Sequence, residues 1–358
     1  MNAAAKSYDG ENKYIRITDI DESSSTYVDK DVVSPDGMLS DNFLVKEQDI
    51  LLARTGASTG KTYLYRKSDG KLYYAGFLIR ANVTTHNPYF LFCQLHTHRY
   101  WRWVSIMSAR SGQPGINSQE YSSFPVFTTS IQEENKIAKL LSLLDERIST
   151  QTKIIDKLQS LIKGISNKLL NMDNGIPICL GEILTERLDR TKKNNQHEIL
   201  SSTVKGIFSQ REYFSKDIAS ENNIGYKVIH LHDIVLSPQN LWMGNINFND
   251  KFDIGIVSPS YKVFSIADGF DKKYVAALLK THHALYNYML VSEQGASIVR
   301  RNLNYEAFEQ LVFKIPSLNK QREIGHALSL LKSRLENANL LIKTYNSQKQ
   351  FMLRQMFI

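Results

Sequence analysis

A glycine-rich stretch near residue 56 carries the side chains best suited to approach a phosphate group. It reads RTGASTGK from Arg54 to Lys61 and follows a strand-like apolar run. A nucleotide-binding loop needs four residues between its first glycine and its Gly-Lys pair, whereas three separate Gly56 from Gly60. The spacing disfavours nucleotide binding, and a degenerate phosphate loop or a purely structural turn stay as alternatives. As a DNA-contacting loop, its candidate residues are Arg54, Ser58, Thr59 and Lys61.

Further loops have the composition of segments that read DNA. Arginine and glutamine side chains can each form two hydrogen bonds to guanine and adenine edges, respectively. The loop RSGQPGIN contributes the candidates Arg110, Ser111, Gln113 and Asn117. In the second half of the chain the candidates are Ser237, Gln239, Asn240, Trp242, Arg300, Arg301 and Asn302. Loop sequences also drift freely, so these residues are DNA-binding hypotheses and not yet a site.

Motifs for catalysis are missing from the sequence. The tetrapeptide Asn87-Pro88-Tyr89-Phe90 is similar to the base-holding motif of adenine methyltransferases, but its second proline and an FxGxG cofactor loop are absent. A proline directly after asparagine is typical of a helix start. The histidines and the two cysteines, Cys93 and Cys179, form no set with metal-ligand spacing. We therefore expect no catalytic residue, no metal and no cofactor bound by this chain.

The composition favours a cytoplasmic protein that binds an anionic partner. The 358 residues carry a net charge of +8, and the isoelectric point is near 9.2. Nucleic acid is the first candidate for that partner, although a merely basic protein would look the same. The sequence has no apolar run long enough to span a membrane, no secretory leader and no paired cysteines. These features favour a reducing, cytosolic location.

The first 129 residues have the pattern of a mixed α/β domain. Strand-like runs occupy residues 13–20 and 49–55, and turn signals separate them. An apolar-aromatic helix is expected from Tyr89 to about Met107, and a short strand at residues 124–127 follows the loop 110–119.

The second half of the chain repeats this order. Residues 49–52 (DILL) match 233–236 (DIVL), and residues 87–95 match 271–279, both at a shift of 184 (233 − 49 and 271 − 87). The shift becomes 187 at Asn117 and Asn304 and is kept through the matching segments LSLL at 141–144 and 328–331. Such a register, held across a domain and the helix after it, indicates an internal duplication.

A long helix follows each domain and has a narrow apolar seam. Apolar residues recur every three or four positions from Ile137 to Leu169, with Gln151 as the polar exception, and again after Ile324. A narrow seam requires a partner helix, so we expect the two helices to pair within one chain, antiparallel. The pairing residues are Ile137, Leu141, Leu144, Ile148, Ile155, Leu158, Ile324, Leu328, Leu331, Leu335 and Ile342.

The predicted fold class is mixed α+β, with two tandem α/β domains separated by two long antiparallel coiled-coil helices in a pseudo-two-fold arrangement. The domains are residues 1–129 and 173–316, and the helices are residues 130–172 and 317–358. A helix rises about 1.5 Å per residue, so 33 residues of seam span roughly 50 Å. The helices are therefore expected to act as a rigid spacer between the domains.

At this point the chain resembles the specificity subunit of type I restriction-modification systems. The resemblance covers nearly the whole chain and rests on IRITDI at 15–20, DILLARTGASTGK at 49–61, SGQPGINSQEYSSFPV at 111–126 and ENKIAKLLSLLDERI at 134–148. It implies a non-catalytic protein with two target-recognition domains, each of which reads half of a split DNA target. The paired helices would fix the gap between the half-sites.

The resemblance also implies partners, and the sequence departs from the family's pattern at one place. The partners would be double-stranded DNA, two methyltransferase subunits and two restriction subunits, with S-adenosylmethionine, ATP and magnesium bound only by those subunits. Residues 179–183 (CLGEI) look like the family's entry into a recognition domain, but the 184-residue shift places the first-half counterpart before Met1. The first domain is therefore expected to lack its opening segment. The alternatives are a coiled-coil adaptor that does not read DNA and a nucleotide-binding protein with a degenerate phosphate loop.

Overall fold

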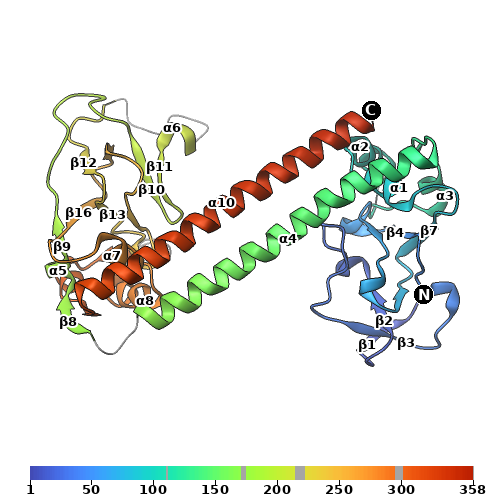
Figure 1. The fold of residues 1–358 in the computed structure, drawn as a ribbon, viewed down its shortest axis with the longest axis horizontal. Coiled ribbons are helices and arrows are strands. Elements are labelled where there is room, and N and C mark those ends of the chain that lie inside the picture. The colour runs from blue at the N-terminus through green and yellow to red at the C-terminus, as the bar shows by residue number, and fades with distance from the viewer. Residues whose placement is uncertain (110–111, 171–174, 214–221, 295–300, 358) are drawn as a thin grey trace. The chain divides into compact units, whose positions relative to one another are not determined.

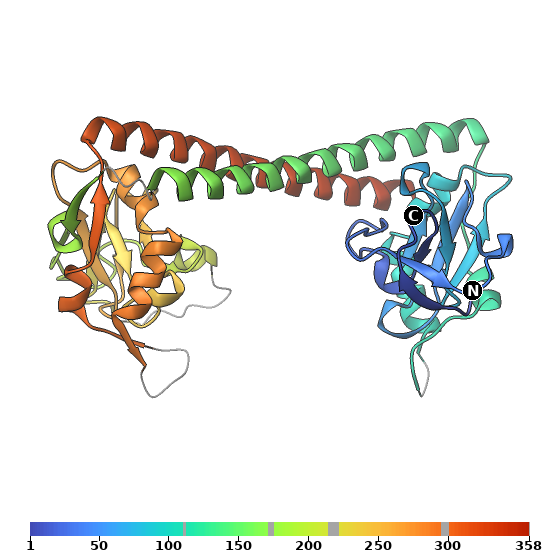
Figure 2. The ribbon, with the colours of Figure 1, turned by 90° about the horizontal axis from the view of Figure 1, so that it is seen from below.

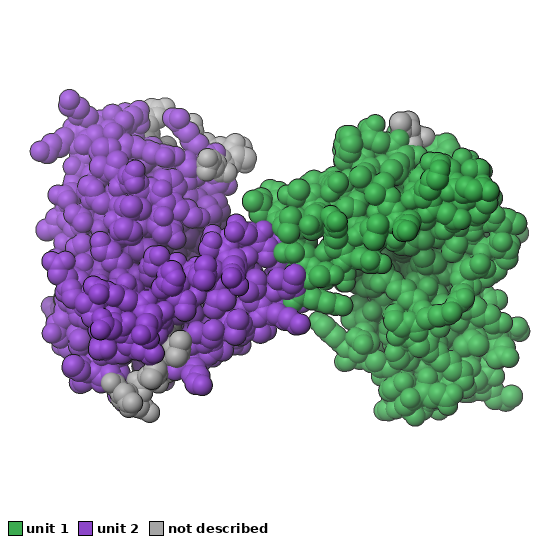
Figure 3. Space-filling model, in the orientation of Figure 1, with its two compact units in different colours: residues 1–153, 340–358 green, residues 154–339 purple. Residues whose placement is uncertain are grey.

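The computed structural model describes residues 1–109, 112–170, 175–213, 222–294 and 301–357. The chain divides into two compact units, residues 1–153 with 340–358 and residues 154–339, which Figure 3 shows in two colours. Each long helix is shared between the units because both divisions fall inside a helix. The predicted domain boundaries stay predictions.

The centre of unit 1 is a three-stranded antiparallel sheet in the order β5-β4-β7. Its middle strand β4 (Asp49–Ala53) confirms the run predicted there, and all five of its residues are buried. Both faces are covered, since Ile50 and Leu52 belong to one apolar cluster and Leu51 and Ala53 to another. A strand that is buried on both faces reads as continuously apolar, as this one does. The flanking strands are β5 (Thr62–Leu64) and β7 (Leu78–Asn82).

The strand predicted at residues 13–20 is shorter than expected. Strand β2 (Lys13–Ile15) pairs in parallel with β6 (Leu72–Tyr74), and a 3-10 turn occupies Ile17–Asp19. The Asp19 carboxylate accepts hydrogen bonds from the Arg16 backbone and guanidinium groups, at 2.7–2.9 Å. This local capping competes with strand pairing and ends the strand. A separate ribbon pairs β1 (Ala4–Ser7) with β3 (Val33–Asp36).

The single helix predicted from Tyr89 to Met107 is wrong, because the structure has two helices there. They are α1 (Pro88–Gln94) and α2 (His98–Met107). The Thr97 hydroxyl donates to the Gln94 carbonyl at 2.7 Å and accepts from the Tyr100 backbone N–H at 3.3 Å. A threonine cap of this kind starts a new helix and breaks the apolar pattern that ran through it.

Residues 124–127 form no strand, contrary to the prediction. The Gln94 side chain binds the Phe127 backbone twice instead, accepting from its N–H and donating to its carbonyl, both at 2.8 Å. In unit 2 the equivalent segment is strand β19 (Val312–Ile315), which pairs with β8 (Ile176–Cys179). In unit 1 the segment has the apolar pattern of a strand but pairs with no strand among the described residues.

Unit 2 repeats the central sheet and adds one strand, in the order β14-β13-β16-β9. Ile50 lies opposite Leu64 in unit 1, and Ile234 lies opposite Phe248 in unit 2, so the register of the duplication is the same. The strands are β9 (Leu184–Glu186), β13 (Ile234–Leu236), β14 (Ile246–Phe248) and β16 (Lys262–Ile266). The duplication inferred from the sequence is thus present in the sheets.

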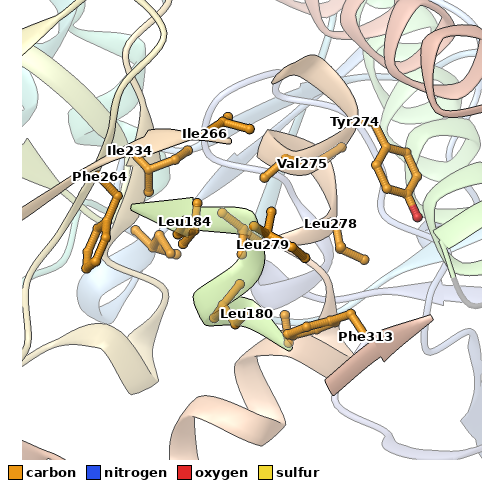
Figure 4. Packing of buried hydrophobic residues seen from close by; sticks show 14 of the residues in the cluster. Leu180, Leu184, Ile234, Phe264, Ile266, Tyr274, Val275, Leu278, Leu279 and Phe313 are labelled. Atoms are coloured by element: carbon orange, nitrogen blue, oxygen red, sulfur yellow. The ribbon is translucent and has the colours of Figure 1, made fainter. Parts of the chain in front are cut away.

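The largest apolar cluster of unit 2 packs helices against one face of this sheet. Figure 4 shows part of it, with Leu180 and Leu184 lying beside Leu279. The helices that contribute are α5 (Leu180–Ile183), α7 (Lys272–Leu278), α8 (His282–Leu290) and α9 (Tyr305–Glu309). The other face is covered by strands β10 (Leu200–Thr203), β11 (Gly206–Ser209), β12 (Lys227–His230) and β15 (Ile254–Val257). A short helix α6 (Gln210–Tyr213) follows β11, and β17 (Ser292–Gln294) pairs with β18 (Arg301–Leu303).

The two long helices are α4 (Ile131–Leu170) and α10 (Leu318–Met356), and Figures 1 and 2 show each as a continuous ribbon. Within unit 1, Leu141 of α4 shares an apolar cluster with Leu353 of α10. Within unit 2, Ile165 of α4 packs against the cluster that contains Ile324 and Leu328 of α10. Residues near the start of one helix pack with residues near the end of the other, so the helices run antiparallel within each unit. All eleven predicted pairing residues are buried or half-buried, which agrees with the predicted seam.

Candidate nucleic-acid interface

The structure brings the two predicted loops of unit 1 together. The Gly56 N–H donates to the Pro114 carbonyl at 2.9 Å, and the Ile116 N–H donates to the Arg54 carbonyl at 2.9 Å. A β-bridge between Thr55 and Gly115 completes the pairing. Residues 54–61 and 112–117 therefore form one surface element, which we call the unit 1 paired loops.

The side chains of Arg54 and Gln113 are exposed on these paired loops. Gly56 has a φ of +68°, and a Cβ atom there would lie 3.0 Å from the Gln113 amide nitrogen. Glycine thus allows both the backbone turn and the approach of Gln113. Ser58 is half-buried, and the Lys61 amine lies 3.5 Å from the exposed Glu22 carboxylate. The unit 1 paired loops therefore present two exposed side chains, Arg54 and Gln113, that are able to bind bases. They also carry one cation, Lys61, at their edge.

Two predicted residues of unit 1 have side chains occupied by local structure. The buried Thr59 hydroxyl donates to the Gly56 carbonyl at 2.7 Å. The Asn117 side chain caps helix α3 (Ser118–Ser122) by accepting from the Glu120 N–H at 2.9 Å. Both shape the loops, and direct DNA contact by either stays a prediction. The predicted residues Arg110 and Ser111 lie outside the described residues.

Two buried tyrosines hold the unit 1 paired loops from below. The Tyr100 hydroxyl donates to the Gly60 carbonyl at 2.9 Å, and the Tyr121 hydroxyl accepts from the Gly60 N–H at 3.1 Å. Tyr121 also donates to the Ala53 carbonyl at 2.6 Å. Burial raises the pKa of Tyr121 to about 12, so its hydroxyl stays protonated and able to donate. Gly60 is therefore fixed on both its polar backbone groups.

In unit 2 the corresponding loops are joined by one backbone hydrogen bond among the described residues, and they carry different side chains. The Arg301 N–H donates to the Gln239 carbonyl at 3.2 Å, which joins the loop after β13 to strand β18. With shifts of 184 and 187, this bond falls within one residue of the Gly56–Pro114 bond of unit 1. We call residues 237–245 and 301–302 the unit 2 paired loops. The scaffold is shared, and the residues at the tips are not.

Arg301 and Trp242 meet on the unit 2 paired loops. The Arg301 guanidinium carbon lies 4.6 Å from the centre of the Trp242 ring, a cation–π contact. The Arg301 Nε is buried and has no hydrogen-bond partner among the described residues. A buried donor without an acceptor is uncommon, and it marks this arginine as incompletely satisfied without a ligand.

The other predicted residues of unit 2 divide between surface and core. Gln239 and Asn302 are exposed, and Asn240 is half-buried. Ser237 is buried, and its backbone N–H donates to the Asn245 carbonyl at 2.9 Å, so it belongs to the base of the loop. Arg300 lies outside the described residues. Gln239 and Asn302 are therefore the two exposed side chains among these residues, and their contact with DNA stays a prediction.

One residue of the unit 1 surface was missed by sequence reasoning. Phe77 is 60% exposed, and its carbonyl accepts from the Arg54 N–H at 3.0 Å. A large exposed aromatic beside a polar loop is informative, because such side chains bind bases or thymine methyl groups. In the sequence it follows Ala75-Gly76 at an unremarkable turn, so only the fold places it beside Arg54.

The structure does not support a nucleotide-binding loop. Residues Gly56–Ser58 form a 3-10 turn that leads into strand β5 and not into a helix. A phosphate loop uses the backbone amides at a helix start, and this turn lacks them. Within the described ranges, histidine, cysteine and acidic side chains form no group able to hold a metal ion. The described helices also include none long and apolar enough to cross a membrane.

Residues 1–160 match the family model described as the type I restriction modification DNA specificity domain. The matched range includes the unit 1 paired loops and most of helix α4. The match therefore covers the first copy of the duplicated arrangement.

Three solved structures match this chain. A type I restriction-modification S subunit from M. genitalium is 14% identical and has a TM-score of 0.64, with 98% of this chain and 89% of that chain covered. A structure described as the basis of assembly and conformational transition of the type I R-M system is 13% identical, with a TM-score of 0.47 and coverage of 96% and 90%. The HsdS subunit from Thermoanaerobacter tengcongensis is 12% identical, with a TM-score of 0.42 and the same coverage. At these identities, the first comparison shows a shared fold.

Proposed function

We propose that this chain is a DNA specificity protein of a type I restriction-modification system, because residues 1–160 match the model of that family, and that it reads a split DNA target with one half assigned to each unit. In this role it is not itself a catalyst: it selects the DNA on which partner subunits act. The observation that carries the proposal is the paired-loop arrangement, which occurs once in each unit with different exposed side chains. Two different half-sites require this combination of a shared scaffold and divergent tips.

The charge of the chain supports binding to the DNA backbone as well as to bases. The net charge of +8 favours an anionic partner, and contacts to phosphates position a protein before base contacts select the sequence. In unit 1 the exposed Arg54 and Gln113 are assigned to the first half-site. In unit 2 the second half-site is assigned to Gln239, Arg301 and Asn302.

The chain assembles with methyltransferase and restriction subunits, and we propose two copies of each. The support is a duplicated apolar surface on the long helices, outside the seam. Leu143 is 47% exposed and its repeat counterpart Leu330 is 48% exposed, while Ile154 and its counterpart Leu341 are 42% and 39% exposed. Exposed aliphatic side chains at equivalent positions of both repeats fit two copies of one partner. S-adenosylmethionine, ATP and magnesium are assigned to those subunits, and the assembly acts on DNA in the cytoplasm.

Binding measured at increasing salt tests the DNA-reading proposal. The chain, assembled with its methyltransferase subunits, is titrated on duplexes that carry the split target or the same halves at a changed spacing. We expect preference for the split target and an affinity that falls steeply with salt, because each phosphate contact releases counterions. Binding that ignores salt, or equal binding to an undivided site, would reject the proposal, and no binding to DNA would favour a protein-only adaptor.

A further inference from the structure

Lys280, just after helix α7 in unit 2, has an unusual set of partners for a lysine. It is half-buried, and its Nζ donates to the Gly244 carbonyl at 2.8 Å and to the Asn247 side-chain oxygen at 2.9 Å. Among the described residues its printed contacts include no carboxylate. Burial, with a smaller effect of the nearby Lys332, lowers the pKa of Lys280 to about 8. A lysine held in such surroundings costs stability unless its hydrogen bonds compensate.

The first partner, Gly244, ends the turn that presents Trp242. Gly244 has a φ of +87° and donates its N–H to the Leu241 carbonyl at 2.7 Å, which closes the 3-10 turn Leu241–Met243. Trp242 lies in this turn, beneath the Arg301 guanidinium. A chain of contacts therefore runs from Lys280 through the Gly244 backbone to the cation–π pair of the unit 2 paired loops.

The second partner, Asn247, joins the same loop to the β10–β11 hairpin. Its side-chain amide donates to the Ser202 hydroxyl and to the Thr203 carbonyl, both at 2.7 Å. Asn245 donates to the Ser202 carbonyl at 3.1 Å. Ser202, Asn245 and Asn247 are all buried, so the network is shielded from water. Buried, satisfied networks of this kind fix one geometry.

In the two units, equivalent glycine carbonyls accept hydrogen bonds from different donors. Gly60 of unit 1 and Gly244 of unit 2 are repeat counterparts (244 − 60 = 184) with φ of +91° and +87°. Tyr100 supplies the donor to Gly60 at 2.9 Å. The counterpart of Tyr100 is Ala284, which has no hydroxyl, and Lys280 supplies the donor to Gly244 in its place. The carbonyl has thus kept a donor although the residue that provides it has changed.

We propose that Lys280 is the positioning residue of the second half-site: it fixes the Gly244 turn and, through Trp242, sets the place of Arg301 against the DNA. This inference rests on the proposed function and deepens it. Lys280 does not touch the DNA in this assignment, and its effect is confined to the half of the target read by unit 2. Tyr100 has the corresponding role for the half read by unit 1.

The experiment compares Lys280→Met with the matched variant Tyr100→Phe, each assembled with the methyltransferase subunits. Affinity is measured on duplexes with single base changes in the first or the second half-site. We expect Lys280→Met to lower discrimination in the second half by about tenfold, within the range that one bidentate base contact supplies, and to leave the first half unchanged. Tyr100→Phe is expected to do the reverse. Equal discrimination in Lys280→Met and wild type, or an equal loss at both halves, overturns the inference.

The pH dependence separates positioning from a purely structural effect. Discrimination in the second half should decline in the wild type as pH rises above about 8, because Lys280 loses its charge and with it the stronger, charge-assisted hydrogen bonds. The charged groups near it are Lys332 of α10 and, facing Lys332, Asp250 and Glu336. Discrimination in the first half should stay level over this range, and a parallel decline at both halves contradicts the inference. A wild-type complex without any sequence preference rejects the proposed function itself.

Discussion

Lys349 of helix α10 donates a hydrogen bond to Asp145 of helix α4 across 2.6 Å, which joins residues 204 positions apart in the sequence. Asp145 also accepts a short hydrogen bond from the Tyr89 hydroxyl of helix α1. One carboxylate therefore connects both long helices and the first helix of unit 1. The repeat counterpart of Asp145 in unit 2 is Lys332, so this connection belongs to unit 1 alone.

Replacing Asp145 with alanine should destabilise unit 1. The change leaves Lys349 and Tyr89 without their acceptor, and an unsatisfied, partly buried donor costs about 1–3 kcal/mol. Denaturant unfolding of wild type, Asp145→Ala, Lys349→Ala and the double variant measures the coupling. Coupling of at least about 0.5 kcal/mol is expected, and fully additive effects would show that the contact contributes nothing to stability.

Glu134 makes the stability of unit 1 sensitive to acid. Its buried carboxylate accepts from the Asn87 N–H and the His86 ring, each at 2.8 Å. Burial alone would raise its pKa, but these hydrogen bonds outweigh burial, and the pKa of Glu134 is lowered. A carboxyl with a lowered pKa contributes stability that is present above its unfolded pKa, near 4.5, and is lost as pH falls through the folded value.

The variant Glu134→Gln tests this contribution, because glutamine stands at the equivalent position of unit 2. The counterpart Gln321 accepts from the Asp271 N–H at 2.9 Å in unit 2. We expect the variant to be less stable than wild type at pH 7 and the difference to shrink as pH falls below about 4. Unfolding free energies between pH 3 and pH 7 measure it. A difference independent of pH would mean that the carboxylate charge is not involved.

Gly60 should tolerate no side chain. Its φ of +91° is unfavourable for other residues, and a Cβ atom would lie 2.7 Å from Val104. Gly60→Ala is expected to cost about 1–3 kcal/mol and to weaken reading of the first half-site only. Gly10→Ala is the control, because Gly10 lies outside the unit 1 paired loops and has the same φ of +91°, but nothing lies within 4 Å of a Cβ atom there. Thermal unfolding and half-site binding measure both variants, and similar behaviour of the two would contradict the proposed role of the Gly60 backbone.

The duplicated apolar surface predicts that a charge on either copy of it removes one of the two bound methyltransferase subunits. Leu143→Glu and Leu330→Glu each place a charge on one copy of that surface, and neither residue is buried, so the fold should be retained. Native mass spectrometry of the assembly should show one methyltransferase subunit with either variant and none with the double variant. Two bound copies in the double variant would place the partner surface elsewhere.

The repeat, the sheets and the long helices were accessible from the sequence because their signals are local or periodic. Strand β4 is apolar from Ile50 to Ala53, and the seam from Ile137 repeats every three or four residues. Two predictions failed because a competing side chain decided the outcome. Thr97 starts a second helix where one continuous helix was predicted, and Gln94 binds the Phe127 backbone where the sequence resembles a strand.

The candidate site was only partly predictable for a different reason. Arg54 and Gln113 were recognisable because their residue types match base recognition. Their pairing through Gly56 and Pro114, and the exposure of Phe77 beside Arg54, depend on contacts between segments that are far apart in the chain. Lys280 has no motif at all. We infer its role from its hydrogen bond to the Gly244 carbonyl and from the alanine at position 284. No pattern in the sequence reveals that these residues act together.

The most direct test of split-target reading is a map of DNA methylation in the host with the gene intact, with the gene deleted, and with Gln113→Ala or Arg301→Ala in its place. We predict a split adenine-methylated motif that vanishes on deletion. Gln113→Ala should relax the bases of one half only, and Arg301→Ala those of the other half. Loss of both halves in either variant, or an unchanged motif after deletion, would contradict the assignment of one half-site to each unit.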